Sequence, residues 1–134
     1  MILNEYSKLD QPFILGLMDV YNERDIIEYT ILNMRAQEIP LLVVDNGSTD
    51  GSSEILRKHV GTDILELVAL RTEFFELGLL LRTLHEMAKK YNPKWLLLAD
   101  ADEFFEPPFR SVSLRNAIEL EDSRGYNLIQ FNNF

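Results

Sequence analysis

Short apolar runs alternate along this chain with longer amphipathic segments, and this alternation restricts the possible folds more than any other feature. The apolar runs are five to seven residues long, which is the length of buried strands. Between them apolar residues recur at helical spacing, as Ile27, Ile31 and Met34 do at i, i+4 and i+7. We expect strands at 13–18, 39–44, 64–70, 94–99 and 127–131, and helices at 25–37, at 52–60, from Leu77 to the Asn92–Pro93 stop, and after Ser113.

Strands that alternate with helices imply βαβ crossovers. They predict an α/β fold with a mostly parallel sheet that helices cover on both faces. The chain has 134 residues, of which 46% are hydrophobic, and it contains no repeat or linker, so we expect one domain over residues 1–134. Sheets of this kind bind ligands at the carboxyl ends of their strands, where the strand order reverses.

Composition excludes several classes of partner and chemistry. The formal net charge of -9 argues against a nucleic-acid partner, because an acidic surface repels phosphate. The absence of cysteine excludes disulfides and thiolate nucleophiles, and it fits a reducing, cytoplasmic compartment. No segment approaches the ~20 apolar residues of a membrane span. An acidic protein that binds a phosphorylated ligand needs a cation or local donors to offset its own field.

Three polar clusters directly follow expected strands. Tyr21 and Glu23 follow the first strand, and Asp45 begins a polar stretch after the second. Asp100 and Asp102 follow the fourth strand. Because neighbouring strands are only ~4.8 Å apart, these clusters can converge on one small molecule at one edge of the sheet.

Each cluster also has a purely structural explanation. The stretch DNGSTDGSSE can be a turn and a helix cap, with Asp50 as the cap of the helix that begins at Ser52. The stretch DADEF can be a solvated loop, and Glu23 can simply favour the positive end of a helix. A calcium loop is excluded, because Asp50 and Leu56 occupy the positions that require glycine and glutamate. Only the coincidence of all three clusters at one edge favours a binding site.

Three stretches of the sequence together resemble a known family. DVYNERDII (19–27), LLVVDNGSTDGSSEIL (41–56) and WLLLADADEFFEP (95–107) look like the nucleotide-binding half of family 2 glycosyltransferases of the GT-A fold. The last stretch is similar to a subgroup in which Glu-Phe follows the DxD motif. The resemblance runs from about Phe13 to the end of the chain. It implies a Rossmann-like sheet of GT-A type that is incomplete at its C-terminal side.

The resemblance implies a role for each cluster in binding a nucleoside-diphosphate sugar, usually a UDP-sugar. Tyr21, in the loop that also carries Glu23, would stack on the base, and Asp45 would accept a ring N–H. Asp100 would lie near the ribose. Asp102 would bind the divalent metal, Mg²⁺ or Mn²⁺, that bridges the diphosphate. The acceptor stays unknown.

The chain also departs from the family pattern. Asp19 and Val20 stand where many members have proline before the tyrosine. Arg82 stands near the position of an arginine with which the family contacts the diphosphate. The family's general base lies beyond the matched region, so no catalytic residue is nominated. We therefore expect the chain to be the donor-binding portion of a metal-dependent glycosyltransferase, truncated before the acceptor half and attached to a membrane, if at all, through other regions.

Two alternative functions remain open at this stage. A non-catalytic nucleotide-binding or protein-interaction module would share the fold and lack the base. A nucleotidyltransferase would share the sheet and an aspartate-bound metal, but it requires a glycine-rich basic loop where this chain reads MDVYNER. The outer edge of a strand at 127–131 would offer a surface for a homodimer.

Overall fold

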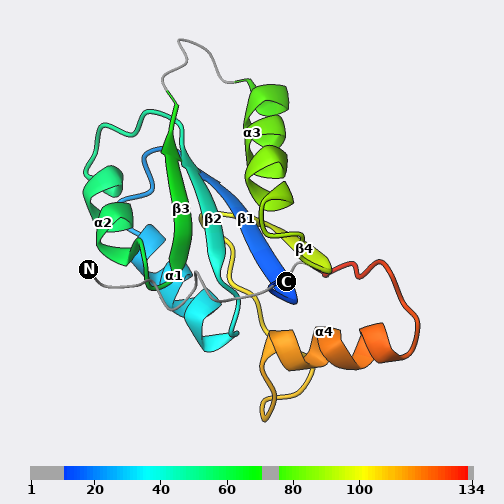
Figure 1. The fold of residues 1–134 in the computed structure, drawn as a ribbon. Helices are drawn as coiled ribbons and strands as arrows, with labels where there is room; N and C mark the ends of the chain where they lie inside the picture. The colour runs from blue at the N-terminus through cyan, green and yellow to red at the C-terminus, as the bar shows by residue number, and fades with distance from the viewer. Residues whose placement is uncertain (1–10, 71–75, 133–134) are drawn as a thin grey trace.

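Four strands alternate with four helices in the computed structural model, which describes residues 11–70 and 76–132 (Figure 1). The elements are β1 (Ile14–Val20), α1 (Ile27–Ala36), β2 (Leu41–Asp45), α2 (Ser52–His59), β3 (Ile64–Ala69), α3 (Leu77–Lys89), β4 (Trp95–Asp100) and α4 (Leu114–Ser123). The predicted α/β class is confirmed, and each of these elements lies within a few residues of its predicted position.

All neighbouring strands in the sheet are parallel, and their order is β3-β2-β1-β4. The chain moves outward from β1 through β2 to β3, and then returns to place β4 on the other side of β1. The strand order therefore reverses between β1 and β4. At such a switch point the loops diverge and leave a crevice at the carboxyl ends of the strands.

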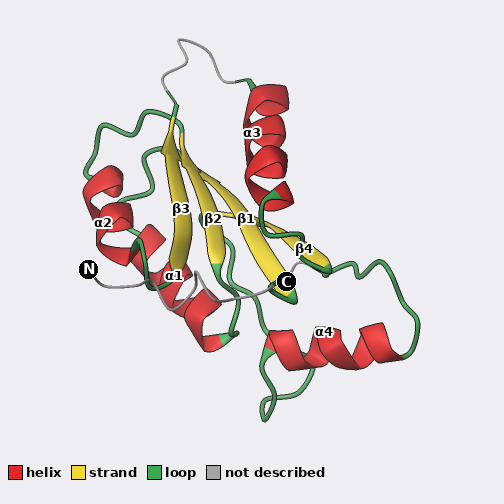
Figure 2. Cartoon of the chain, in the orientation of Figure 1, coloured by secondary structure: helices red, strands yellow, loops and turns green. Residues whose placement is uncertain are grey.

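Helices cover both faces of the sheet (Figure 2). Successive side chains of β1 point to opposite faces: Ile14 and Met18 belong to a core with α1, α2 and α4, whereas Leu15 and Leu17 belong to a core with α3. A strand covered on both faces buries nearly all its side chains. This explains why the central strands are continuous apolar runs rather than alternating ones.

The predicted strand at 127–131 is wrong, because this segment has no regular secondary structure. Its apolar side chains are nevertheless used: Ile129 and Phe131 pack against the core, and the ring of Phe131 meets Phe105 edge-on at 5.1 Å between centroids. The apolar residues Ile129 and Phe131 thus serve side-chain packing without a backbone ladder. In the described part of the sheet β4 is therefore one of the two edge strands and pairs only with β1, while β3 forms the other edge.

Only some of the leucines on α3 are buried. Leu80, Leu84, Met87 and Ala88 are buried against the sheet, whereas Leu77 and Leu81 are 52% and 44% exposed. The helix is apolar over a wider arc than the sheet can cover.

Candidate functional site

The loops that follow β1, β2 and β4 emerge at the same edge of the sheet. Val20 pairs in register with Asp45, and Asp19 pairs with Asp100. Parallel strands that end at the same level bring the residues after them together. The structure thereby gathers the three polar clusters that the sequence places far apart.

Asp45 is buried, with only 4% of the residue exposed, and its carboxylate accepts two hydrogen bonds. Oδ1 accepts the backbone N–H of Ser48 at 3.0 Å, and Oδ2 accepts the hydroxyl of Ser53. A carboxylate can accept about four hydrogen bonds, so two acceptor positions remain for a ligand. Asp45 also lines a groove between α2 and β3, together with Ser53, Arg57 and Ala69.

The loop that carries Tyr21 is fastened to the loop after β2 through Asn22. The backbone N–H of Asn22 donates to Ser48 Oγ at 3.0 Å, and Asn22 Oδ1 accepts the backbone N–H of Thr49 at 2.7 Å. Asn22 has a φ of 53°, a left-handed conformation that asparagine tolerates better than most residues. Tyr21 is 57% exposed beside these fixed loops, so more than half of this residue is accessible to a ligand.

The start of α2 also joins the two loops, and its N-cap residue differs from the predicted Asp50. Gly51, with a φ of 105°, is the N-cap residue in place of Asp50. The carboxylate of Asp50 still accepts the Ser52 backbone N–H at 2.9 Å and the backbone N–H of Arg24 at 3.0 Å. The Ser52 hydroxyl in turn accepts the backbone N–H of Glu23 at 2.9 Å. Asp50 therefore ties two loops together while supporting the helix.

Negative charge accumulates where the β1 loop faces the β4 loop. Burial raises the pKa of Asp19, and the neighbouring charge of Asp100 raises it further. Burial likewise raises the pKa of Glu23, followed by the charges of Asp102 and then Asp50. The charges of Glu23 and Asp102 thus belong to one negatively charged region of the site. The carboxylates repel one another, and a bound cation would relieve that repulsion.

The acidic loop after β4 turns sharply. Glu103 Oε2 accepts the backbone N–H of Asp100 at 3.3 Å, and the Asp100 carbonyl accepts the Glu103 N–H at 3.1 Å. Glu103 is thus occupied by the turn, whereas the residues Asp100 and Asp102 are exposed. In residues 11–70 and 76–132 no three acidic, histidine or cysteine side chains are arranged to hold a metal ion by themselves. A metal at Asp102 would take most of its ligands from a bound diphosphate and water.

A comparison with protein-family models identifies the chain. The model described as glycosyl transferase family 2 matches residues 17–122, which is well over half of the 134 residues. The chain belongs to glycosyl transferase family 2. Members of this family transfer a sugar from a nucleotide sugar to an acceptor, so this glycosyltransferase domain takes a nucleotide-sugar donor. No curated protein sequence matches the chain.

The matched region of this family 2 glycosyltransferase contains every predicted site residue. The sheet brings Tyr21, Glu23 and Asp45 to one edge with Asp100 and Asp102. Arg82 lies exposed on α3, and none of the contacts described above involves it. No helix of the described chain is long and apolar enough to cross a membrane.

Sequence reasoning missed the residues that hold the loops in place. Asn22, Ser48, Ser52 and Ser53 all contact the backbone or the carboxylates of neighbouring loops. The abundance of serine in NGSTDGSS was the available signal for three of them, but the atom that each one bonds depends on how two loops meet.

Proposed function

We propose that this domain binds a UDP-sugar at the carboxyl edge of its sheet, with a divalent metal ion, as the donor-binding part of a glycosyltransferase. The observation that supports this most is the strand register. It sets Asp45 beside Val20, the residue before Tyr21, and sets Asp100 beside Asp19, all within the family-matched region.

The base would be held by the first two loops. An aromatic face such as the exposed ring of Tyr21 can stack on uracil, and a carboxylate can accept its ring N–H. Asp45 retains free acceptor positions and lines the groove next to α2. Hydrogen bonds from the Ser48 N–H and the Ser53 hydroxyl orient the carboxylate, so it needs little reorganisation on binding.

The diphosphate and its metal would lie at the third loop. Mg²⁺ and Mn²⁺ prefer oxygen ligands, and Mg²⁺ is commonly bound by one or two carboxylates together with substrate phosphates and water. Asp102, with Asp100 beside it for the ribose, fits that pattern, as does the mutual repulsion of the acidic groups around it. When bound, the metal would stabilise the charge that develops on the departing diphosphate.

Calorimetric titration tests this proposal. We expect UDP to bind more tightly with Mn²⁺ or Mg²⁺ than in EDTA, because the acidic loop repels a diphosphate unless a cation lies between them. Uridine, which has no phosphate, should bind equally with and without metal. Equal binding of UDP in EDTA would remove the metal from the proposal, and equal binding of CDP, whose base lacks the ring N–H, would remove the role of Asp45.

A further inference from the structure

We propose that Thr30 and Asn33 of α1 are positioning residues for Asp100 and Asp102, because they hold the loop after β4 in the course that presents both carboxylates to the site. This inference rests on the proposed function and deepens it. It concerns residues that lie on a helix away from the expected ligand contacts.

Thr30 bonds the backbone in the middle of the acidic motif. Its hydroxyl donates to the carbonyl of Ala101, the residue between Asp100 and Asp102, over 2.6 Å. Thr30 is fully buried, at 0% exposure, and Ala101 is 6% exposed, so water cannot substitute for this bond. The alanine carbonyl is therefore fixed from the core side, while the two carboxylates on either side of it face outward.

Asn33 fixes the same loop four residues further on. Its Oδ1 accepts the backbone N–H of Phe105 at 2.9 Å, and its Nδ2 donates to the Phe105 carbonyl at 3.2 Å. The amide thus pairs with both polar groups of one backbone residue, as a neighbouring strand would. Phe105 is itself buried and packs against Phe131, so the far end of the loop is anchored twice.

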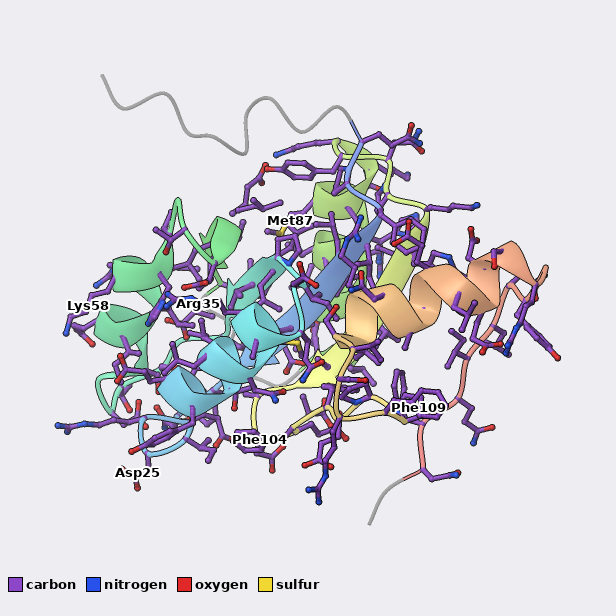
Figure 3. All side chains as sticks on the ribbon, turned by 90° about the horizontal axis from the view of Figure 1, so that it is seen from below. Asp25, Arg35, Lys58, Met87, Phe104 and Phe109 are labelled. Atoms are coloured by element: carbon purple, nitrogen blue, oxygen red, sulfur yellow. The ribbon has the colours of Figure 1, made fainter. Side chains whose placement is uncertain are left out.

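These contacts belong to one stripe of α1. Thr30, Asn33 and Gln37 are spaced i, i+3 and i+7, which places them on one side of the helix. The side chain of Gln37 continues the pattern by accepting the backbone N–H of Leu114 at 2.7 Å, at the start of α4. Figure 3 shows the segment after β4, with Phe104 labelled, beside α1. A segment without regular structure needs such partners for its backbone groups.

Side chains of the loop itself give it limited support. Asp100 and Asp102 are exposed, and Phe104 is 51% exposed, so burial of these side chains does little to hold the loop. The bonds from α1 to Ala101 and Phe105 therefore add to the burial of these two residues in fixing the course of the loop.

Replacement of the Thr30 hydroxyl tests the positioning role. Thr30→Val keeps the shape of the side chain and removes the bond to Ala101, together with a longer contact of 3.3 Å to the Ile26 carbonyl. We expect the affinity for Mn²⁺ with UDP to fall about tenfold, as loss of one well-placed hydrogen bond would cause. Uridine would meet the acidic loop only through its ribose and has no phosphate to hold the metal, so its affinity should fall less. Thr30→Ser restores the hydroxyl and should restore the affinity for Mn²⁺ with UDP.

Thr83→Val is the matched control. The hydroxyl of Thr83 donates to the carbonyl of Leu79 within α3, over 2.8 Å, and makes no bond to the acidic loop. Calorimetry on the folded variants should give unaltered binding of Mn²⁺ with UDP for Thr83→Val. Asn33→Ala supplies a second test, because it should weaken binding of Mn²⁺ with UDP and speed hydrogen exchange at the Phe105 amide.

The outcomes separate this inference from the proposed function. Equal weakening of uridine and UDP binding in Thr30→Val would show a general effect on the fold and overturn the positioning role. Unchanged binding in both Thr30→Val and Asn33→Ala would overturn it as well. If the unsubstituted chain shows no metal-dependent binding of UDP, the proposed function is wrong and the positioning role falls with it.

Discussion

Asp19 and Asp100 are direct neighbours on the parallel strands β1 and β4, at the point where the strand order of the sheet reverses. Side chains at paired positions project to the same side of a parallel sheet. Two carboxylates therefore lie next to each other at this switch point. Partial burial of Asp19 and the charge of Asp100 raise the pKa of Asp19 above its ordinary value of 3.8.

The pair predicts a pH-dependent gain in stability for Asp19→Asn. A raised pKa means that the folded protein holds this proton more tightly than the unfolded chain. The contribution of protonated Asp19 to the free energy of unfolding is thus fully present below pH 3.8. It is lost as the pH rises through the folded-state pKa of Asp19. We expect the variant to be more stable than the unsubstituted chain at neutral pH, with a difference that closes in acid. Urea unfolding at neutral pH and in acid measures the stability difference between the two proteins. A less stable variant at neutral pH would show that the carboxylate is needed structurally.

Asp45→Asn should weaken uridine and UDP binding by about 1.5–3 kcal/mol, the range for a hydrogen bond to a charged group. The loss should be the same with and without metal, because the base lies apart from the diphosphate. Ser53→Ala removes a hydroxyl bond that orients Asp45 but leaves the carboxylate in place, so it should weaken binding less than Asp45→Asn does. If Asp45→Asn lowers the melting temperature but binds UDP normally, Asp45 is only a turn residue.

Asp102→Ala should separate metal binding from folding. Removal of a carboxylate that repels Glu23 should leave the ligand-free protein as stable or slightly more stable. It should also abolish the stabilisation by Mn²⁺ with UDP, which is ~2.7 kcal/mol at a hundredfold excess over the dissociation constant. Thermal melts with and without both ligands measure the two effects. Glu106→Ala, an exposed change in the same loop, should keep the ligand-induced shift. Marked destabilisation of ligand-free Asp102→Ala would contradict the metal role.

Asp63→Asn should destabilise the opposite edge of the sheet without affecting the site. Asp63 precedes β3, is 8% exposed, and accepts two hydrogen bonds from Arg35 at 2.8 and 2.7 Å. It also lies 2.8 Å from Nδ1 of the buried His59. Loss of these charge-assisted bonds should cost about 2–3 kcal/mol of unfolding free energy at neutral pH, while UDP binding stays unchanged.

The same residue makes a pH prediction of opposite sign to that of Asp19. The hydrogen bond from Arg35, followed by that from His59, lowers the pKa of Asp63, although burial acts against them. Its stabilising contribution is present above the ordinary pKa of 3.8 and is lost as the pH falls through the lower folded-state pKa. The stability difference between the unsubstituted chain and Asp63→Asn should therefore shrink in strong acid. Urea unfolding across that range checks it, and a constant difference would mean that the charge of Asp63 is unimportant.

Periodicity accounts for what could be predicted of the fold. The spacing of Ile27, Ile31 and Met34 specifies which side of α1 is buried, and all three are buried. The apolar runs that became strands are buried on both faces or flank such a strand, so hydrophobicity alone marks them. Residues 127–131 show where this reasoning fails, because Ile129 and Phe131 pack against the core although this segment forms no strand.

The same distinction between sequence pattern and tertiary contact applies to the candidate site. The sequence by itself determined which residues end the strands, since an apolar run that stops at Asp45 or Asp100 can only place that carboxylate at a sheet edge. Only the tertiary structure decided what those residues touch. The hydrogen bond from Thr30 to Ala101 joins positions 71 residues apart, and that from Asn22 to Ser48 joins positions 26 residues apart. Such contacts depend on the strand order and on the angle at which a helix crosses a loop. Both result from packing of the whole core, which no local stretch of sequence encodes.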